Sequence, residues 1–241
     1  MAPAAAARSR GAVVIPAYRA GARIAAVIEA VRAALPEAEV LVVDDGSDDD
    51  TAARAQSAGA AVAVHETNLG KGRALATGLA AAGALAPAWI VTLDADGQHA
   101  PADASRLLDP LLAGRADLVI GARRRDPRRM PPHRRLSNWL SSALVSRALR
   151  APLPDSQCGF RAMTPDVAAA VTPSGARYEF ETEFLFLAAA RGFRLAAVDI
   201  PTVYDGSPSH FRLVGDTLRL SRVFLRHWRA ILWGGERSRT A

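Results

Sequence analysis

The chain has 241 residues, of which 50% are hydrophobic and 22% are charged, enough apolar content to exclude a chain that is disordered throughout. Its single cysteine, Cys158, excludes an internal disulfide framework and a cysteine-based zinc site, so we expect a cytoplasmic protein. With 30 Lys and Arg against 24 Asp and Glu, the net charge of +6 favours anionic partners such as phosphates, nucleic acids or a membrane surface.

Short β-rich runs alternate with alanine-rich helical segments through the first half of the chain. This alternation predicts an α/β fold, a mostly parallel sheet with helices on both faces. In such sheets ligands bind beyond the carboxyl ends of the strands, so the polar residues that follow the strands are expected to share one crevice. The predicted strands are 12–15, 40–43, 61–64, 89–93 and 117–120, and the predicted helices are 24–35, 48–58, 72–85 and one that opens at Pro101.

The rest of the chain departs from this pattern, and no run of about 18 apolar residues suggests a membrane span. Within 211–241 we expect an amphipathic helix, because four arginines recur at spacings of three and four. That helix either packs on the domain or lies on an anionic membrane surface, and its tryptophans favour the membrane. The other expectations are a disordered tail at 1–10, a basic loop at 122–135, helices at 136–149 and 180–191 and a strand at 195–200.

Two acidic motifs follow predicted strands. In Asp94-Ala95-Asp96-Gly97-Gln98 the carboxylates are one residue apart and point in similar directions. Such oxygens suit Mg²⁺ or Mn²⁺, which also bind substrate phosphates, although a capped turn is the alternative. Asp44-Asp45-Gly46-Ser47 is placed to accept hydrogen bonds from a nucleotide base or ribose. Its alternative role is a helix N-cap made by Ser47 or Asp48.

A glycine-flanked cation opens the helix predicted at 72–85. Lys71 is the only lysine in the chain and lies in Asn68-Leu69-Gly70-Lys71-Gly72-Arg73. Glycines permit a close approach of the backbone, and the start of a helix favours anions. The alternative is a left-handed turn that carries an exposed lysine.

Taken in chain order, these motifs resemble those of a known family. The segments 13–18, 42–47, 68–72 and 94–99 resemble family-2 glycosyltransferases of the GT-A fold. Asp155–Arg161 and Phe180–Glu183 are similar to the branch of dolichyl- and polyprenyl-phosphate sugar synthases. The resemblance implies a GT-A domain at 11–210, a donor such as GDP-mannose or UDP-glucose, and Mg²⁺ or Mn²⁺.

The resemblance also implies roles for individual residues. The metal ligands would be Asp94, Asp96 and Gln98, and the catalytic group would be Asp96, Arg123, Gln157 and Arg161. The nucleotide-sugar would contact Pro16, Tyr18, Asp44, Asp45, Lys71, Asp94, Ala95, Asp96, His210 and Arg212. The acceptor phosphate would contact Arg123, Arg134 and Arg135. His210 stands where the family typically has a lysine, so we expect His210 and Arg212 to take over its phosphate contact.

The expected reaction is metal-dependent transfer of a hexose to a polyprenyl phosphate, with inversion. A lipid phosphate is already anionic, whereas a hydroxyl acceptor, such as a glycan or a small metabolite, would need a general base. Glu181 and Glu183 are candidates for that base, or for partners of arginines such as Arg161. We expect peripheral contact with the inner face of an anionic membrane and no nucleic-acid partner, because aromatic residues do not interleave the arginines. Cys158 is expected to be a small buried residue and His99 a solvated or metal-supporting loop residue.

Overall fold

The computed structural model describes residues 10–123, 142–143, 145–147, 149, 153–175 and 179–201. The predicted tail at 1–10 (Arg10 excepted), most of the basic loop and the helix at 211–241 lie outside these residues, as do Arg134, Arg135, His210 and Arg212. None of the described helices combines the length and the apolar character needed to cross a bilayer.

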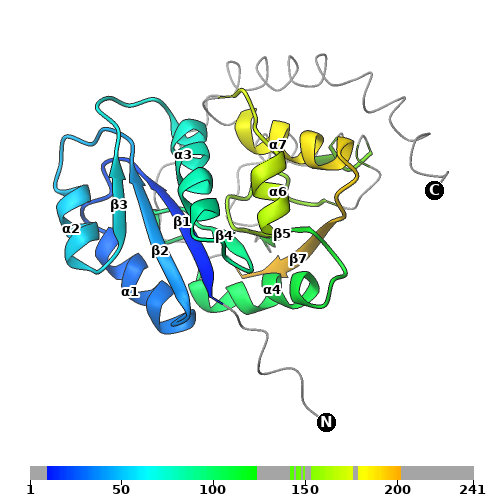
Figure 1. The fold of residues 1–241 in the computed structure, drawn as a ribbon, viewed down its shortest axis with the longest axis horizontal. Helices are drawn as coiled ribbons and strands as arrows, with labels where there is room; N and C mark the ends of the chain where they lie inside the picture. Colours follow the sequence, from blue (N-terminus) through cyan, green and yellow to red (C-terminus); the bar gives the residue numbers. More distant parts are fainter. Residues whose placement is uncertain are drawn as a thin grey trace, which may run out of the picture.

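A twisted, mostly parallel sheet forms the centre of the molecule (Figure 1). The strand order is β3-β2-β1-β4-β6-β5-β7, and only β6 runs antiparallel to its two neighbours. Because β4 and β5 both run antiparallel to β6, they point the same way as β1 and β2. The strands are β1 Gly11–Ala17, β2 Ala38–Asp44, β3 Ala61–Val64, β4 Ile90–Thr92, β5 Leu118–Arg123, β6 Arg161–Met163 and β7 Leu195–Ile200.

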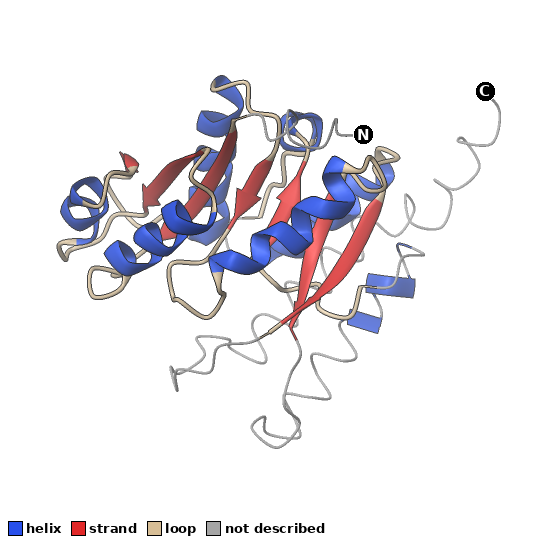
Figure 2. Ribbon diagram, turned by 90° about the horizontal axis from the view of Figure 1, so that it is seen from below, coloured by secondary structure: helices blue, strands red, loops and turns tan. Residues whose placement is uncertain are grey.

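Helices cover both faces of this sheet (Figure 2). On one face α3 packs against β1 and β2 and contacts α6 and α7, while α1 lies beside α2 and η1. The apolar positions of α1 recur at helical spacing, so its buried residues Ile24, Val27, Ile28 and Val31 form one stripe toward the sheet. The helices are α1 Ile24–Ala34, α2 Thr51–Ser57, α3 Lys71–Ala84, the 3₁₀ turn η1 Pro101–Asp103, α4 Ala104–Leu112, α6 Pro165–Ala170 and α7 Glu179–Ala190.

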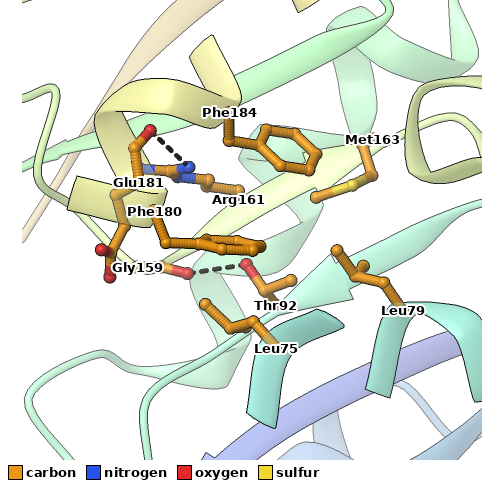
Figure 3. A pocket seen from close by; sticks show the side chains of 9 residues that line it. All are labelled: Leu75, Leu79, Thr92, Gly159, Arg161, Met163, Phe180, Glu181 and Phe184. Atoms are coloured by element: carbon orange, nitrogen blue, oxygen red, sulfur yellow. Dashed lines mark hydrogen bonds between the residues drawn. The ribbon is translucent and has the colours of Figure 1, made fainter. Parts of the chain in front are cut away.

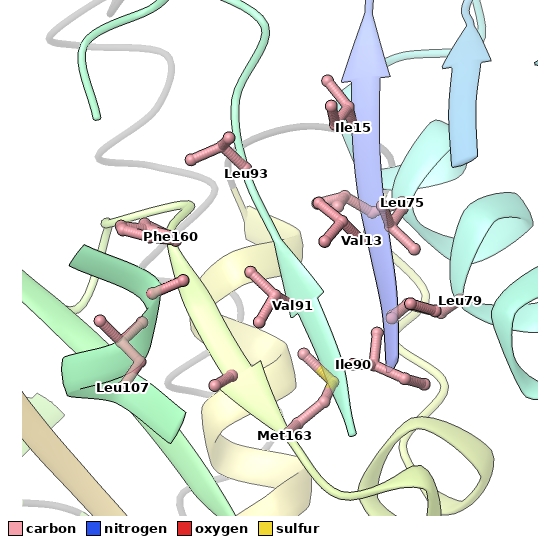
Figure 4. Packing of buried hydrophobic residues seen from close by; sticks show 14 of the residues in the cluster. Val13, Ile15, Leu75, Leu79, Ile90, Val91, Leu93, Leu107, Phe160 and Met163 are labelled. Carbon is pink, nitrogen blue, oxygen red and sulfur yellow. The ribbon is translucent and has the colours of Figure 1, made fainter. Parts of the chain in front are cut away.

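The core lies between the sheet and these helices (Figure 4). All of β1 is buried, as expected for a central strand with helices on both faces. Helix α3 sits so close to β1 that a Cβ on Gly78 would lie 2.3 Å from Val14 Cγ1. Each fully buried aliphatic side chain contributes about 1.5–3 kcal/mol, so this packing fixes where the strand ends point.

The predicted α/β fold is confirmed, and the differences are local. Strand β6 and helix α6 were not predicted. Strand β6 has only three residues and begins with an arginine, so the alternation typical of a strand is not visible in the sequence. Strand β5 extends to Arg123, which is therefore a strand residue rather than the start of a loop. Helix α2 begins at Thr51, after an N-cap position at Asp50, so the expected N-cap by Ser47 or Asp48 is wrong.

Candidate active site

The candidate metal ligands follow β4. Asp94 and Asp96 are both partly exposed, and Asp96 Oδ1 accepts a 2.9 Å hydrogen bond from the Gln98 main-chain N–H. Asp94 packs directly on Gly159, because a Cβ there would lie 2.5 and 2.6 Å from its two carboxylate oxygens. The carbonyl of Gly159 is itself fixed by a 2.7 Å hydrogen bond from the Thr92 hydroxyl. The Asp94 carboxylate therefore lies directly against a fixed stretch of main chain.

Asp94, Asp96 and the Gln98 amide offer few protein oxygens to a cation. Among the residues that the structure describes, no group of three or more His, Cys, Asp or Glu side chains is arranged to hold a metal ion. Mg²⁺ and similar hard ions suit such a site, since they bind through one or two carboxylates and complete their shell with water and substrate phosphates. The residues present therefore fit a divalent ion that is shared with a bound diphosphate.

The side chain of Lys71, the first residue of α3, reaches this cluster. Lys71 Nζ lies 2.8 Å from Asp94 Oδ1, 3.1 Å from Asp94 Oδ2 and 2.9 Å from Glu181 Oε1. Burial lowers the pKa of Lys71, but the two carboxylates outweigh burial and raise this pKa above its ordinary value. Burial raises the pKa of Asp94, and the Lys71 charge outweighs it and holds that pKa below its usual range. An exposed surface lysine, the alternative for this motif, is therefore wrong.

Asp45, just beyond the end of β2, holds the loop that precedes Lys71. Its carboxylate accepts hydrogen bonds from the main-chain N–H groups of Leu69 at 3.0 Å and Gly70 at 2.7 Å, and lies 2.8 Å from His65 Nδ1. Gly70 has a φ of 97°, a left-handed conformation that glycine adopts without strain. In the structure Asp45 thus orders the loop, and its contact with a nucleotide base stays a prediction.

The other predicted donor contacts lie at the ends of β1 and β2. Tyr18 follows β1 and is 45% exposed, and the Arg19 guanidinium lies 5.3 Å from the centroid of its ring. Arg19 is tied to Asp48 by hydrogen bonds of 2.7 and 2.6 Å. Asp44 accepts hydrogen bonds from the main chain and hydroxyl of Ser47. Pro16, by contrast, is buried within β1.

Arg123, the predicted acceptor contact at the end of β5, is oriented by Asp155. Its Nε lies 2.6 Å from Asp155 Oδ2 and its Nη2 lies 3.2 Å from Oδ1, a two-point pairing that fixes the plane of the guanidinium. Burial lowers the pKa of Arg123, and the Asp155 carboxylate outweighs burial and raises it, so the side chain stays charged. It remains 22% exposed. Gln157 donates a 2.6 Å hydrogen bond to the Thr182 hydroxyl in α7.

Arg161, for which the sequence predicts a substrate contact, lies inside the protein. This residue is 3% exposed, and it donates to the main-chain carbonyls of Cys158 at 2.9 Å and of Ser156 and Glu181 at 3.2 Å. Figure 3 shows the Glu181 carboxylate turned away from the guanidinium, beside a small cavity of about 10 Å³. Arg161 therefore cross-links the 156–158 segment to α7 from within the core. The hydrogen bonds described for its guanidinium all go to main-chain carbonyls, and its predicted contact with substrate stays a prediction.

The two glutamates of α7 have different surroundings. Glu183 accepts 2.9 Å hydrogen bonds from the main-chain N–H groups of Ser174 and Gly175 and one of 3.0 Å from the Ser174 hydroxyl. Glu181 is 2% exposed and pairs with Lys71, and its Oε2 has no hydrogen-bond partner among the described residues. Only Glu181 therefore belongs to the site. Their shared motif gave no signal that distinguishes the two.

His99 and Cys158 form a buried, neutral pair next to the metal-ligand segment. His99 Nε2 lies 3.8 Å from Cys158 Sγ, and the His99 ring is 5.4 Å from that of Phe160. Burial lowers the pKa of His99 to about 4 and raises the pKa of Cys158 to about 12. The expectation of a solvated His99 is wrong, because the residue is 5% exposed, whereas a buried Cys158 is confirmed.

Most of the predicted groups in the described part of the chain come together at one edge of the sheet. Because β1, β2, β4 and β5 are parallel, their carboxyl ends lie at the same edge. This edge carries Tyr18, Asp44, Asp94 and Arg123, and α3 brings Lys71 to it. Such a constellation is that of a GT-A glycosyltransferase, an enzyme that binds an activated sugar at the strand ends.

Comparison with known proteins agrees with this class. Residues 12–171 match the model of glycosyl transferase family 2, and the chain belongs to that family. An undecaprenyl-phosphate mannosyltransferase of Micrococcus luteus is 30% identical, over 94% of this chain and 97% of that protein. A polyprenol monophosphomannose synthase of Mycolicibacterium smegmatis is 31% identical, over 90% of this chain and 85% of that protein. One similar solved structure is glucosyl-3-phosphoglycerate synthase from Mycobacterium tuberculosis in complex with Mn²⁺, UDP and glucosyl-3-phosphoglycerate. It matches with a TM-score of 0.72 and 26% identity, over 95% of this chain and 81% of that chain.

Proposed function

We propose that this glycosyltransferase moves a hexose from a nucleotide-sugar to a polyprenyl-type lipid phosphate, with a divalent ion and with inversion at the anomeric carbon. One observation carries the proposal. The acids that follow β4 and the Lys71 ammonium share a sheet edge with the oriented Arg123 guanidinium. The edge thus offers groups for a metal-bound diphosphate and, separately, a cation for a second phosphate.

The donor half of the site is formed by β1, β2 and β4. Tyr18 presents an exposed ring for a base or ribose. Asp44, which is 2% exposed and accepts from Ser47, is the proposed acceptor of their hydrogen bonds. A divalent ion held by Asp94, Asp96 and Gln98 would neutralise the diphosphate as it leaves. GDP-mannose and UDP-glucose are the donors we propose. One relative is named a mannosyltransferase and another a monophosphomannose synthase, and a similar solved structure contains UDP-glucose.

The acceptor half is formed around Arg123. A phosphate monoester is anionic at neutral pH, so the protein needs to position it rather than to remove a proton. Asp155 fixes the Arg123 fork, which suits phosphate oxygens. Arg134, Arg135, His210 and Arg212 remain proposed phosphate contacts outside the described residues. A lipid acceptor also requires peripheral contact with an anionic membrane at its inner face, which we assign to the segments 122–135 and 211–241.

A second candidate function is transfer to the hydroxyl of a small phosphorylated acceptor. It is favoured by the likeness to an enzyme whose complex contains glucosyl-3-phosphoglycerate. It is also favoured by Glu181, a carboxylate beside the site with an oxygen available to accept a proton. In this case Glu181 would serve as general base.

Radiolabelled donors distinguish the two candidates. The purified protein is incubated with GDP-mannose or UDP-glucose and Mn²⁺, together with either polyprenyl phosphate or 3-phosphoglycerate. The proposal expects label in the organic phase that depends on the lipid and on the metal, and no label with Asp96→Asn. Label that stays in the aqueous phase on the soluble acceptor would contradict the lipid assignment. Donor hydrolysis without either product would contradict both.

A further inference from the structure

Asp94 and Glu181 share the single ammonium of Lys71. Lys71 Nζ contacts both oxygens of Asp94, at 2.8 and 3.1 Å, and Oε1 of Glu181 at 2.9 Å. The Lys71 and Asp94 side chains are 29% and 23% exposed, while that of Glu181 is 2% exposed. The lysine thus lies between a carboxylate at the crevice and a carboxylate inside the protein.

The two carboxylates do not share the ammonium equally. Lys71 Nζ contacts both oxygens of Asp94 but only Oε1 of Glu181, and Glu181 Oε2 has no hydrogen-bond partner among the described residues. The buried guanidinium of Arg161 also interacts electrostatically with both carboxylates. A buried carboxylate that lacks partners is costly, so proteins normally satisfy it, as the main-chain N–H groups of Ser174 and Gly175 do for Glu183. The open oxygen of Glu181 is therefore not explained by packing alone. It leaves room at Glu181 for stronger pairing with the ammonium.

Asp94 lies against the main chain of Gly159 as well as beside the ammonium, since a Cβ on Gly159 would lie 2.5 and 2.6 Å from its two oxygens. A divalent ion on Asp94 would then stand next to the ammonium, and like charges a few ångströms apart repel strongly where water is partly excluded. Either the metal or the ammonium must therefore give up its hold on Asp94.

We infer that Lys71 is an internal counter-ion that competes with the divalent ion for Asp94, and that Glu181 is the anchor to which the ammonium retreats. The retreat keeps Lys71 beside the crevice, where it contributes to binding the diphosphate of the donor. Glu181 is in this account a positioning residue that acts through Lys71. The inference rests on the proposed metal site and adds a counter-ion that occupies Asp94 before donor and metal arrive together.

The inference is tested by binding, without turnover. Mn²⁺ binding is measured from the loss of the electron paramagnetic resonance signal of the free ion, with and without UDP or GDP. Lys71→Met is expected to bind Mn²⁺ alone about tenfold more tightly than wild type, since a competing charge is removed, and to bind the Mn²⁺–nucleoside diphosphate more weakly. Glu181→Gln is expected to weaken binding of Mn²⁺ alone severalfold, because the ammonium then has only Asp94.

A double-mutant cycle separates an effect through Lys71 from a simple loss of nearby negative charge. In the Lys71→Met background, Glu181→Gln should change Mn²⁺ affinity much less than it does in wild type. If Lys71→Met alone folds poorly, the double variant is compared with Glu181→Gln instead. The double variant should then bind Mn²⁺ more tightly, because it lacks the competing ammonium. Glu183→Gln is the matched control: it removes the same charge from the same helix and should leave Mn²⁺ affinity unchanged.

Two results would overturn the inference while the proposed metal site stands. One is that wild type binds Mn²⁺ and Lys71→Met binds it no more tightly. The other is that Glu181→Gln weakens Mn²⁺ binding equally in both backgrounds. Failure of the wild-type protein to bind Mn²⁺ even with UDP or GDP would instead overturn the metal site itself, and the inference with it.

Discussion

Gly159→Ala is expected to damage the site through the position of Asp94. The added methyl would lie 2.5 and 2.6 Å from the Asp94 oxygens, whereas ordinary contact begins at 3.4 Å, so the carboxylate must move by about 0.9 Å. The backbone cannot move instead, since the Gly159 carbonyl accepts from Thr92 and the next residue, Phe160, is 1% exposed. A displacement of this size in a catalytic group costs about 100-fold in kcat/KM. Overpacking should also lower the free energy of unfolding by about 1–3 kcal/mol.

The assay is metal-dependent transfer together with urea unfolding, and Gly83→Ala is the control. A Cβ on Gly83 meets no atom within 4 Å, and the residue lies near the exposed end of α3. Alanine there should leave transfer unchanged and stabilise the protein by up to about 1 kcal/mol. Wild-type kcat/KM and Mn²⁺ affinity in Gly159→Ala would refute the claim that Asp94 is held in a working position by this contact.

Three further outcomes follow from the geometry. Asp96→Asn should abolish Mn²⁺-dependent transfer with an unchanged unfolding midpoint, and wild-type rates in this variant would show that the metal ligands are wrongly assigned. The buried Cys158 thiol should react with iodoacetamide at pH 8 about 100-fold more slowly in the native protein than in urea, so rapid native labelling would contradict its burial. Because burial lowers the pKa of His99 from 6.5 to about 4, the unfolded chain binds the extra proton between these values. The free energy of unfolding of the metal-free protein should therefore fall by about 2 kcal/mol more between pH 8 and pH 5 than that of His99→Gln. An equal fall for both proteins in urea unfolding would contradict this.

Sequence periodicity was sufficient to predict the parallel strands of the sheet and the edge at which the candidate residues gather. The strand that ends at Asp44 and the one that ends shortly before Asp94 are largely buried apolar runs, and parallel strands bring their carboxyl ends together. The antiparallel strand at Arg161 escaped prediction because its pairing is decided by distant neighbours, β4 and β5, and not by its own three residues.

The roles of charged residues were harder to predict, because burial and partners decide them. Lys71 and Arg161 are both cations inside motifs that resemble those of the family, yet Lys71 meets carboxylates and Arg161 meets only main-chain carbonyls in the hydrogen bonds described. Glu181 and Glu183 are two residues apart on one helix, and only the first faces the site. A one-dimensional pattern does not distinguish such pairs.

Contact with an anionic membrane is tested by deletion. Removing the residues after Arg219 should release the protein from liposomes that contain anionic lipid, since the helix predicted there from the sequence would present arginines along one face. Unchanged liposome binding would assign the contact to the 122–135 segment instead.

A crystal structure with Mn²⁺ and a nucleoside diphosphate tests the central claim most directly. The account predicts an anomalous manganese peak at the carboxyl end of β4, in contact with the Asp96 carboxylate and with the diphosphate. A peak elsewhere, or Asp96 and Gln98 turned away from both ion and nucleotide, would contradict it.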